Sequence, residues 1–283
     1  MEENKSDTYE LNDLVKKIKK EKEKKQKPKP NNNETITFAD SRYAADEKML
    51  RQYITDDKTK DKFNNTNYMY HICTLLNSFC STRMGADRVY ATAMTFAEDG
   101  DLIQEILGQE APLDDEQLNN IQASMCQKLK LRKSERDLLE DEGKHFRSYS
   151  FATKFLAFHS EFKDNLNNGS LFPIYDGQVK TVLTKYKLKR IETLKEFVTK
   201  FDKELEKNKE WQSFLEYCDD NKIKTICLEN YPEFYKLMRI LSLATGLNLT
   251  RLDRFFWKLG DDIQKKENEK KQKNKENNKQ QKN

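Results

Sequence analysis

The sequence predicts an all-α fold of roughly ten helices, and three observations support this prediction. Between residues 34 and 263, apolar residues recur at the spacing of one helix face, whereas alternating runs suited to strands are scarce. The 283 residues include only eight Gly and five Pro, too few for a β-sandwich with many turns. The composition is 36% hydrophobic and 11% aromatic, enough for a core, and the 35% of charged residues indicates solvated tails.

Apolar stripes place the individual helices along the chain. They predict helices, in order, around residues 68–79, 89–96, 118–125, 149–162, 177–186, 191–207, 209–218, 231–245 and 248–260. Gly85 separates the first two. Asp114 is the expected N-cap of the third, because a carboxylate there accepts hydrogen bonds from the free N–H groups of the first turn.

Two basic tails flank this helical domain, which we place at residues 34–263. Residues 1–33 hold ten Lys against seven acidic residues, a net charge of +3. Residues 264–283 hold eight Lys against three acidic residues, a net charge of +5. Since the whole chain carries +4, the domain between the tails carries −4. This distribution excludes a uniformly basic nucleic-acid-binding body.

The two tails differ in their apolar content. Four apolar residues in the first tail lie at i, i+3, i+4 and i+7 and predict a short amphipathic helix: Leu11, Leu14, Val15 and Ile18. Pro28 and Pro30 end any helix there, so we interpret it as a transiently docking helix on a flexible tail. Residues 264–283 contain no apolar residue and are predicted to be disordered. The tails are also candidates for contacting a protein partner.

Several classes of protein are disfavoured. No apolar run approaches the roughly 20 residues of a membrane helix, and the N-terminus lacks a signal-peptide core, so we expect a cytoplasmic protein without membrane contact. The five cysteines form no CxxC pair, which favours reduced thiols. The three histidines likewise lack the spacing of metal ligands, and we expect neither a metal site nor a cofactor.

The stretch from Ser148 to Tyr186 is the most informative for function. Four phenylalanines share one helix face: Phe151, Phe155, Phe158 and Phe162. Ser150 and Lys154 lie one turn apart on the flank of this stripe, at the expected boundary between core and solvent. Partial desolvation favours the neutral amine of a lysine, which is the nucleophilic form.

The second half of this stretch contains a candidate catalytic carboxylate. Pro173 imposes an extended approach to a helix whose expected N-cap is Asp176. Backbone amides of the next turn would hold this carboxylate ionised. A fixed anion of this kind suits a reaction that develops positive charge on a sugar.

Two segments resemble those of a known family. The segment FPIYDGQVKTVL resembles the Phe-Pro-Ile-Leu-Asp-Gly-Asn-Val-Lys-Arg-Val-Leu segment of adenine-mismatch DNA glycosylases, and more generally the catalytic-Asp segment of the helix-hairpin-helix DNA glycosylase superfamily. Upstream, Phe79-Cys80-Ser81-Thr82-Arg83, followed by Arg88-Val89, resembles the Ile-Cys-Ser-Ser-Asn segment of the 8-oxoguanine glycosylase branch. The two segments occur in the family's order, across roughly residues 65–190.

The resemblance implies a two-lobed all-α fold and base excision from DNA or a related nucleic acid. In this family a nucleotide is flipped from the duplex and an Asp stabilises charge at C1′, which implies that role for Asp176. Ser150 aligns where bifunctional members have their nucleophilic Lys, and Lys154 lies one turn later. Two mechanisms follow: Lys154 is a displaced nucleophile that forms a Schiff base, or the protein is monofunctional and Asp176 activates water.

The resemblance also names candidate nucleic-acid contacts and shows departures from the family. Arg83 lies in the segment that lines the gap left by the extruded nucleotide, and Asn77 falls where adenine-specific members have their catalytic Glu. The hairpin Gly-x-Gly is absent, and Lys144 or Arg147 would supply the phosphate contact instead. No iron–sulfur cysteine cluster is present.

We therefore expect a divergent glycosylase-like enzyme with a role in DNA repair or antiviral defence. The alternative is a catalytically inert helical module that binds nucleic acid or protein.

Overall fold

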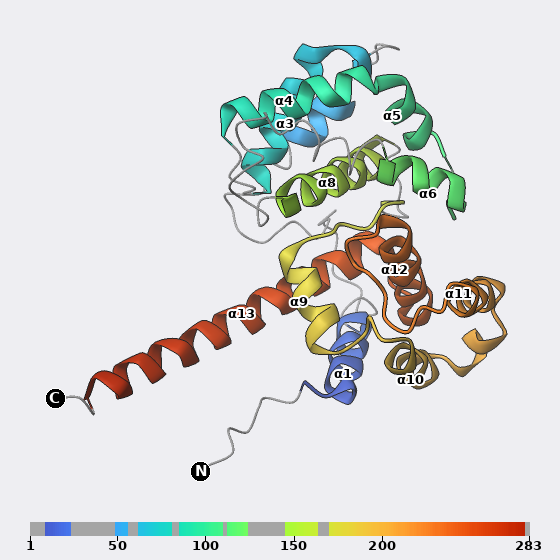
Figure 1. Cartoon of the computed structure of the whole chain (residues 1–283), viewed down its shortest axis with the longest axis vertical. Coiled ribbons are helices and arrows are strands. Elements are labelled where there is room, and N and C mark those ends of the chain that lie inside the picture. The colour runs from blue at the N-terminus through green and yellow to red at the C-terminus, as the bar shows by residue number, and fades with distance from the viewer. Residues whose placement is uncertain are drawn as a thin grey trace, which may run out of the picture. The chain divides into compact units, whose positions relative to one another are not determined.

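The computed structural model describes residues 9–23, 49–55, 62–80, 85–109, 112–123, 145–163 and 170–280, without the side chains of residues 79, 145–148, 162–163 and 276–280. Helices make up nearly all of its regular structure (Figure 1), and the predicted all-α fold is confirmed. Within the described residues, β-pairing is limited to one isolated antiparallel bridge between Arg190 and Thr225.

Contacts along the chain divide it into two compact units, which we call the terminal unit and the central unit. The terminal unit contains Met1–Lys27, Asp176–Leu228 and Lys236–Asn283. The central unit contains Pro28–Tyr175 and Glu229–Tyr235. The helix α12 (Tyr231–Thr245) begins in the central unit and continues into the terminal unit.

The central unit is built from helices, and one of them begins at a side-chain cap that the sequence predicted. In chain order they are η1 (Lys62–Asn64), α3 (Thr66–Phe79), α4 (Ala86–Glu98), α5 (Gly100–Leu107), α6 (Asp115–Ile121) and α8 (His145–Lys163). Asp114 caps α6 as predicted: its carboxylate accepts the N–H of Gln117 at 2.8 Å, and the Gln117 side chain accepts the N–H of Asp114 at 3.0 Å. This reciprocal pair is a capping box.

Residues 151–160 of helix α8 are buried on every side of the helix. All ten residues from 151 to 160 are buried, whereas a single phenylalanine stripe would leave one face in solvent. The prediction of a one-sided stripe was therefore wrong for α8. The buried stretch includes the polar side chains of Lys154 and His159, so its burial reflects the elements that surround the helix and not an apolar residue on every face.

The terminal unit contains most of the remaining helices. They are α1 (Leu11–Glu23), α9 (Gly177–Lys185), α10 (Ile191–Phe201), η3 (Lys203–Lys207), α11 (Lys209–Asp220) and α13 (Leu249–Gln280). The single helix predicted over residues 191–207 is instead broken at Asp202. The Asp202 side chain accepts the N–H of Glu204 at 3.0 Å and thereby begins η3.

Helix α1 is a packed element of the terminal unit, not a transiently docking one. The predicted apolar face is buried, with Leu14 and Ile18 fully inaccessible to solvent. This face packs against α10, and Lys200 of α10 donates to Asn12 at 2.6 Å. The sequence pattern identified the buried face but carried no information about the partner helix.

Helix α13 continues far beyond the predicted end of the helical domain. We predicted a disordered tail from residue 264, whereas the structure extends the helix to Gln280 (Figure 1). Side-chain pairs support its first part: Lys265 bonds Asp261 one turn earlier at 2.6 Å, and Lys185 of α9 bonds Glu267 at 2.5 Å. Lys, Glu and Gln also have good intrinsic helix propensity, which apolar patterning does not reveal.

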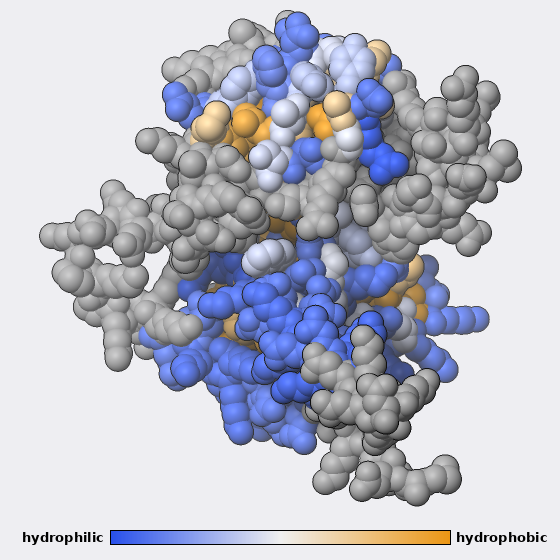
Figure 2. All heavy atoms as spheres, turned by 90° about the vertical axis from the view of Figure 1, so that its left-hand side faces the viewer, coloured by the Kyte–Doolittle hydropathy of each residue, from blue (hydrophilic) through white to orange (hydrophobic). Residues whose placement is uncertain are grey.

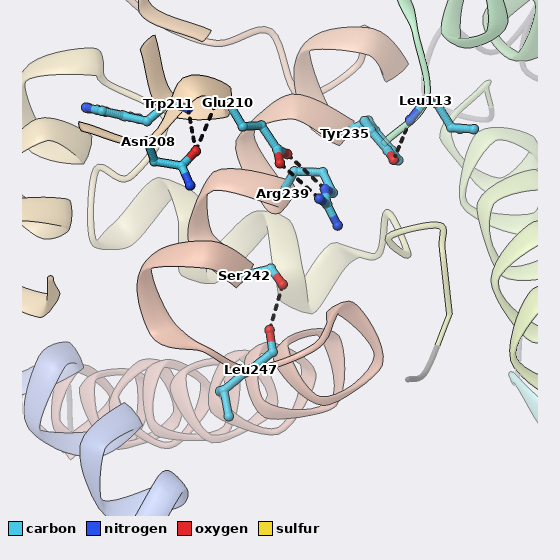
Figure 3. A network of polar contacts seen from close by, with 8 residues as sticks. All are labelled: Leu113, Asn208, Glu210, Trp211, Tyr235, Arg239, Ser242 and Leu247. Carbon is cyan, nitrogen blue, oxygen red and sulfur yellow. Dashed lines mark hydrogen bonds and ion pairs between the residues drawn. The ribbon is translucent and has the colours of Figure 1, made fainter. Parts of the chain in front are cut away.

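An ion pair joins two helices of the terminal unit, and its removal is expected to lower stability. Figure 3 shows Arg239 of α12 facing both carboxylate oxygens of Glu210 on α11, with Nε and Nη2 each 3.0 Å from an oxygen. We expect Arg239→Leu to lower the free energy of unfolding by about 1.5 kcal/mol in urea titrations, because the pair is bidentate and only partly exposed. Arg239→Lys keeps the charge without the fork and should lose about half as much. Equal losses for both variants would contradict a role for the bidentate geometry.

Candidate functional site

An extended segment before α9 is fastened to α8 within the central unit. The Ser160 hydroxyl accepts the N–H of Leu171 at 3.0 Å. The Ser170 hydroxyl accepts the N–H of Phe172 at 3.0 Å and donates to the Phe172 carbonyl at 2.9 Å. Phe172 itself is fully buried. The backbone N–H groups of Leu171 and Phe172 and the Phe172 carbonyl are therefore hydrogen-bonded, and the Phe172 side chain lies in the core.

The last residue of this segment, Tyr175, is held by a second hydroxyl of α8. The Thr153 hydroxyl accepts the N–H of Tyr175 at 3.0 Å and donates to the Ser150 carbonyl at 3.0 Å. The Tyr175 ring lies 4.5 Å from the ring of Tyr149, and its hydroxyl donates to the Glu229 carboxylate at 3.3 Å. These contacts fix the residue that immediately precedes Asp176. Sequence reasoning missed Thr153, because no local pattern indicates a hydrogen bond across 22 positions.

Asp176 is the N-cap of α9, as predicted. Its backbone is extended, and its carboxylate accepts the N–H of Gln178 at 2.9 Å. The residue is only partly buried, so its charge does not suffer full desolvation. The N-terminal end of the helix favours an anion at this position.

The Gln178 backbone is in turn pressed against α13 of the same unit. A Cβ atom at Gly260 would lie 2.7 Å from both the Cα and the carbonyl carbon of Gln178, so only glycine fits there. The side-chain amide of Gln178 also donates to the side-chain oxygen of Gln264 at 3.2 Å. Close packing of α9 on α13 thus places the N–H group that holds the Asp176 carboxylate.

Lys154 is more deeply buried than the sequence predicted. It is 8% exposed, within the enclosed part of α8, and not at a boundary with solvent. Ser150, one turn earlier, is half-buried. The correction has the same cause as that for α8: neighbours cover the flank that the phenylalanine stripe leaves open. Both residues belong to the central unit, whereas Asp176 belongs to the terminal unit.

The predicted nucleic-acid contacts are only partly described. Asn77 is half-buried on α3. Arg83 and Lys144 lie outside the described residues, and Arg147 lies in α8 with its side chain outside them.

The central unit also buries a titratable side chain that sequence reasoning did not single out. His159 of α8 is 1% exposed, and its Nδ1 lies 3.0 Å from the Phe155 carbonyl. Its Nε2 has no hydrogen-bond partner among the described residues. Burial is the main cause that lowers the pKa of His159 to about 3, so the ring is neutral at physiological pH. Burial likewise raises the pKa of the Cys73 thiol, and a neutral thiol there is inert.

The described residues contain neither a metal-binding cluster nor a membrane-spanning helix. Within the described ranges, no three or more His, Cys, Asp or Glu side chains gather closely enough to hold a metal ion. In that part of the chain, no helix combines the length and apolar character needed to cross a membrane.

The chain has no significant match among known protein families, curated proteins or solved structures.

Proposed function

We propose that this protein recognises, and in its active form excises, a flipped nucleobase in DNA or a related nucleic acid. Asp176 is the electrostatic catalyst and Lys154 is the candidate nucleophile, with Ser150 as its neighbour on the same helix. These roles are those implied by the resemblance of residues 172–183 to the catalytic segment of helix-hairpin-helix DNA glycosylases.

The observation that carries the proposal is the way in which Asp176 is held. An extended apolar segment is fastened at Tyr175 by Thr153, and the next residue presents its carboxylate at the start of α9. Gln178 donates its N–H to this carboxylate, and Gly260 lets the Gln178 backbone approach α13 closely. A carboxylate that is held by an N–H group of its own helix and is still partly exposed is suited to stabilise charge on a bound sugar.

The chemistry requires charge stabilisation before bond formation. As the bond between C1′ and the base nitrogen breaks, its electron pair leaves with the base, which then takes up a proton. The Asp176 carboxylate stabilises the positive charge that develops on the sugar. In the monofunctional mechanism, water bonds to C1′ and releases a proton. In the bifunctional one, the Lys154 amine bonds to C1′, loses a proton and opens the sugar ring to give a Schiff base.

The burial of Lys154 favours a second candidate function. A lysine that is 8% exposed within a fully enclosed stretch of α8 offers its amine little access to a substrate. An inert module that binds nucleic acid or protein needs no exposed nucleophile. The two candidates therefore differ in whether base is released at all.

We expect Asp176→Asn to lower base release at least ~100-fold, because it removes the charge and keeps an amide that can still cap α9. Release is measured on duplexes that each carry one modified base, followed by alkaline strand cleavage. Asp202→Asn is the matched control, because Asp202 is also an N-cap of the terminal unit and accepts an N–H at 3.0 Å. Its activity should equal that of the wild type.

Borohydride trapping separates the two mechanisms. A covalent adduct that disappears in Lys154→Gln supports the Schiff base, and release without an adduct supports attack by water. Thermal unfolding of each variant verifies that the fold is retained. Release by Asp176→Asn at the wild-type rate, or no release from any duplex by the wild type, would overturn the enzymatic proposal.

A further inference from the structure

Positive charge is concentrated in one of the two units. Among the described residues, the terminal unit holds 29 Lys and Arg against 20 Asp and Glu, a net charge of +9. The described residues of the central unit hold 6 against 11, a net charge of −5. The sequence assigned the excess basicity to two separate tails, whereas α1 and α13 belong to the same compact unit.

Contacts around the end of α9 bring these two basic segments together. The ring of Tyr9, just before α1, lies 5.5 Å from the ring of Tyr186, and Lys17 donates to the Tyr186 hydroxyl at 3.3 Å. Lys185 lies 5.7 Å over the Tyr9 ring and bonds Glu267 of α13 at 2.5 Å. Segments about 250 positions apart in the sequence are thereby joined at one place on the terminal unit.

Beyond Glu267, α13 projects as a solvated helix. Thirteen further residues lead to Gln280, a length of about 20 Å at 1.5 Å per residue. All residues from 268 to 275 are exposed. Four exposed lysines around this end form no ion pair with any described residue: Lys266, Lys271, Lys273 and Lys275. Figure 2, viewed from the side toward which this end points, shows mostly hydrophilic residues over the described surface of the terminal unit, with a few hydrophobic ones among them.

Helix α1 adds cations to the same unit. Leu14 and Ile18 bury its inner face, and Lys16 and Lys20 lie one turn apart on the exposed face. Buried contacts hold α1 in place, so its lysines are presented from a fixed element.

We propose that α1 and the projecting end of α13 form a surface that binds the phosphate backbone of duplex nucleic acid without reading its sequence. A duplex carries one negative charge per ~1.7 Å of its axis, and lysines on a 20 Å helix can neutralise several of these charges. Residues 264–280 include Lys but no Arg, and Lys lacks the planar fork that reads guanine. The surface is therefore expected to add affinity and not specificity.

The composition of this helix favours nucleic acid over other anionic partners. Helices that lie on membranes need an apolar face, and residues 264–280 contain no apolar residue. Stable protein interfaces depend on buried aromatic or aliphatic anchors, which this segment also lacks. The proposal is independent of base excision, since binding through these lysines needs neither Asp176 nor Lys154.

The test is the salt dependence of binding to a fluorescein-labelled 20-base-pair duplex, followed by anisotropy. We expect the combined Lys→Gln substitution of Lys266, Lys271, Lys273 and Lys275 to weaken binding at least tenfold at 0.1 M salt. The slope of log Kd against log salt should fall by up to about 3.6, because each of the four phosphate contacts contributes about 0.9. Lys16→Gln with Lys20→Gln should lower the slope by about one to two.

The matched control removes the same charge elsewhere on the terminal unit. Lys195, Lys203, Lys209 and Lys224 are exposed, and their combined change to Gln should leave the slope unchanged. Equal weakening by both quadruple variants would overturn the proposal, because net charge alone would then explain binding. It would also be overturned by an unaltered slope in the α13 variant, or by binding to phosphatidylserine vesicles with no binding to the duplex. An unaltered slope in the Lys16 and Lys20 variant would overturn the contribution of α1.

Discussion

Gly260→Val is expected to lower the free energy of unfolding by about 4 kcal/mol, and Gly260→Ala by about half as much. The reason is the contact between α9 and α13. A Cβ atom at residue 260 would lie 2.7 Å from two backbone atoms of Gln178, and no rotamer change can move backbone atoms away. The two helices would have to separate, and the higher helix propensity of alanine, about 1 kcal/mol, offsets only part of this cost.

The matched control for this series is Gly177, the first residue of α9. Apart from its chain neighbours and the backbone of its own helix, a Cβ atom there would have no heavy atom within 4 Å. Gly177→Ala and Gly177→Val are therefore expected to change stability by less than about 1 kcal/mol in urea unfolding. Similar losses at the two positions would show that backbone entropy, and not the contact with Gln178, determines the effect.

The same contact bears on the candidate site. The Gln178 N–H that Asp176 accepts belongs to the residue pressed against Gly260. Gly260→Ala should thus shift the donor that orients the Asp176 carboxylate. If the proposed enzymatic function is correct, base release by Gly260→Ala should fall even at temperatures where the variant remains folded.

Much of the fold could be predicted because the relevant signals are local. Helical spacing of apolar residues placed most helices of both units, although α5 (Gly100–Leu107) was not predicted. The Asp114 and Asp176 caps follow from side chains that reach backbone N–H groups two or three residues ahead. The burial of Leu14 and Ile18 likewise follows from their spacing.

The remaining features depend on contacts between distant residues. Thr153 and Tyr175, or Gly260 and Gln178, have no pattern in the sequence that links them. The full burial of α8, and of Lys154 within it, depends on how many elements surround the helix, which one helix's own periodicity does not report. Residues 264–280 are helical because of intrinsic helix propensity and side-chain ion pairs, which a search for apolar spacing does not detect.

The free energy of unfolding is expected to depend strongly on pH because of His159. The free energy of unfolding should fall by about 4 kcal/mol as the pH is lowered from 6.5 toward 3, through this residue alone. The folded-state pKa is about 3 and the ordinary value is 6.5, so the unfolded chain binds the proton more readily. The contribution of neutral His159 to stability is therefore complete above pH 6.5, and it is lost as the pH falls toward the folded-state pKa.

The surroundings of His159 explain why its protonation is so costly. The ring centroids of Phe155 and Phe63 lie 4.2 and 5.6 Å from that of His159. Neither ring offers a hydrogen-bond acceptor that would stabilise a charged imidazolium. A proton on Nε2 would find no acceptor among the described residues. Lys62 adds a repulsive positive charge, while the Phe155 carbonyl acts in the opposite direction by accepting from Nδ1.

The measurement is urea unfolding of the wild type and of His159→Leu between pH 7 and 4. The absolute stability of the variant reflects repacking, so the informative quantity is the difference between the two proteins as a function of pH. That difference should shift in favour of the variant by about 3 kcal/mol over this range, since roughly one pH unit corresponds to 1.4 kcal/mol once the pH is below 6.5. His71→Leu, which removes an exposed ring of the same unit, provides the comparison. A parallel pH dependence of the wild type and His159→Leu would mean that His159 is hydrated in solution, which the enclosed environment of α8 does not allow.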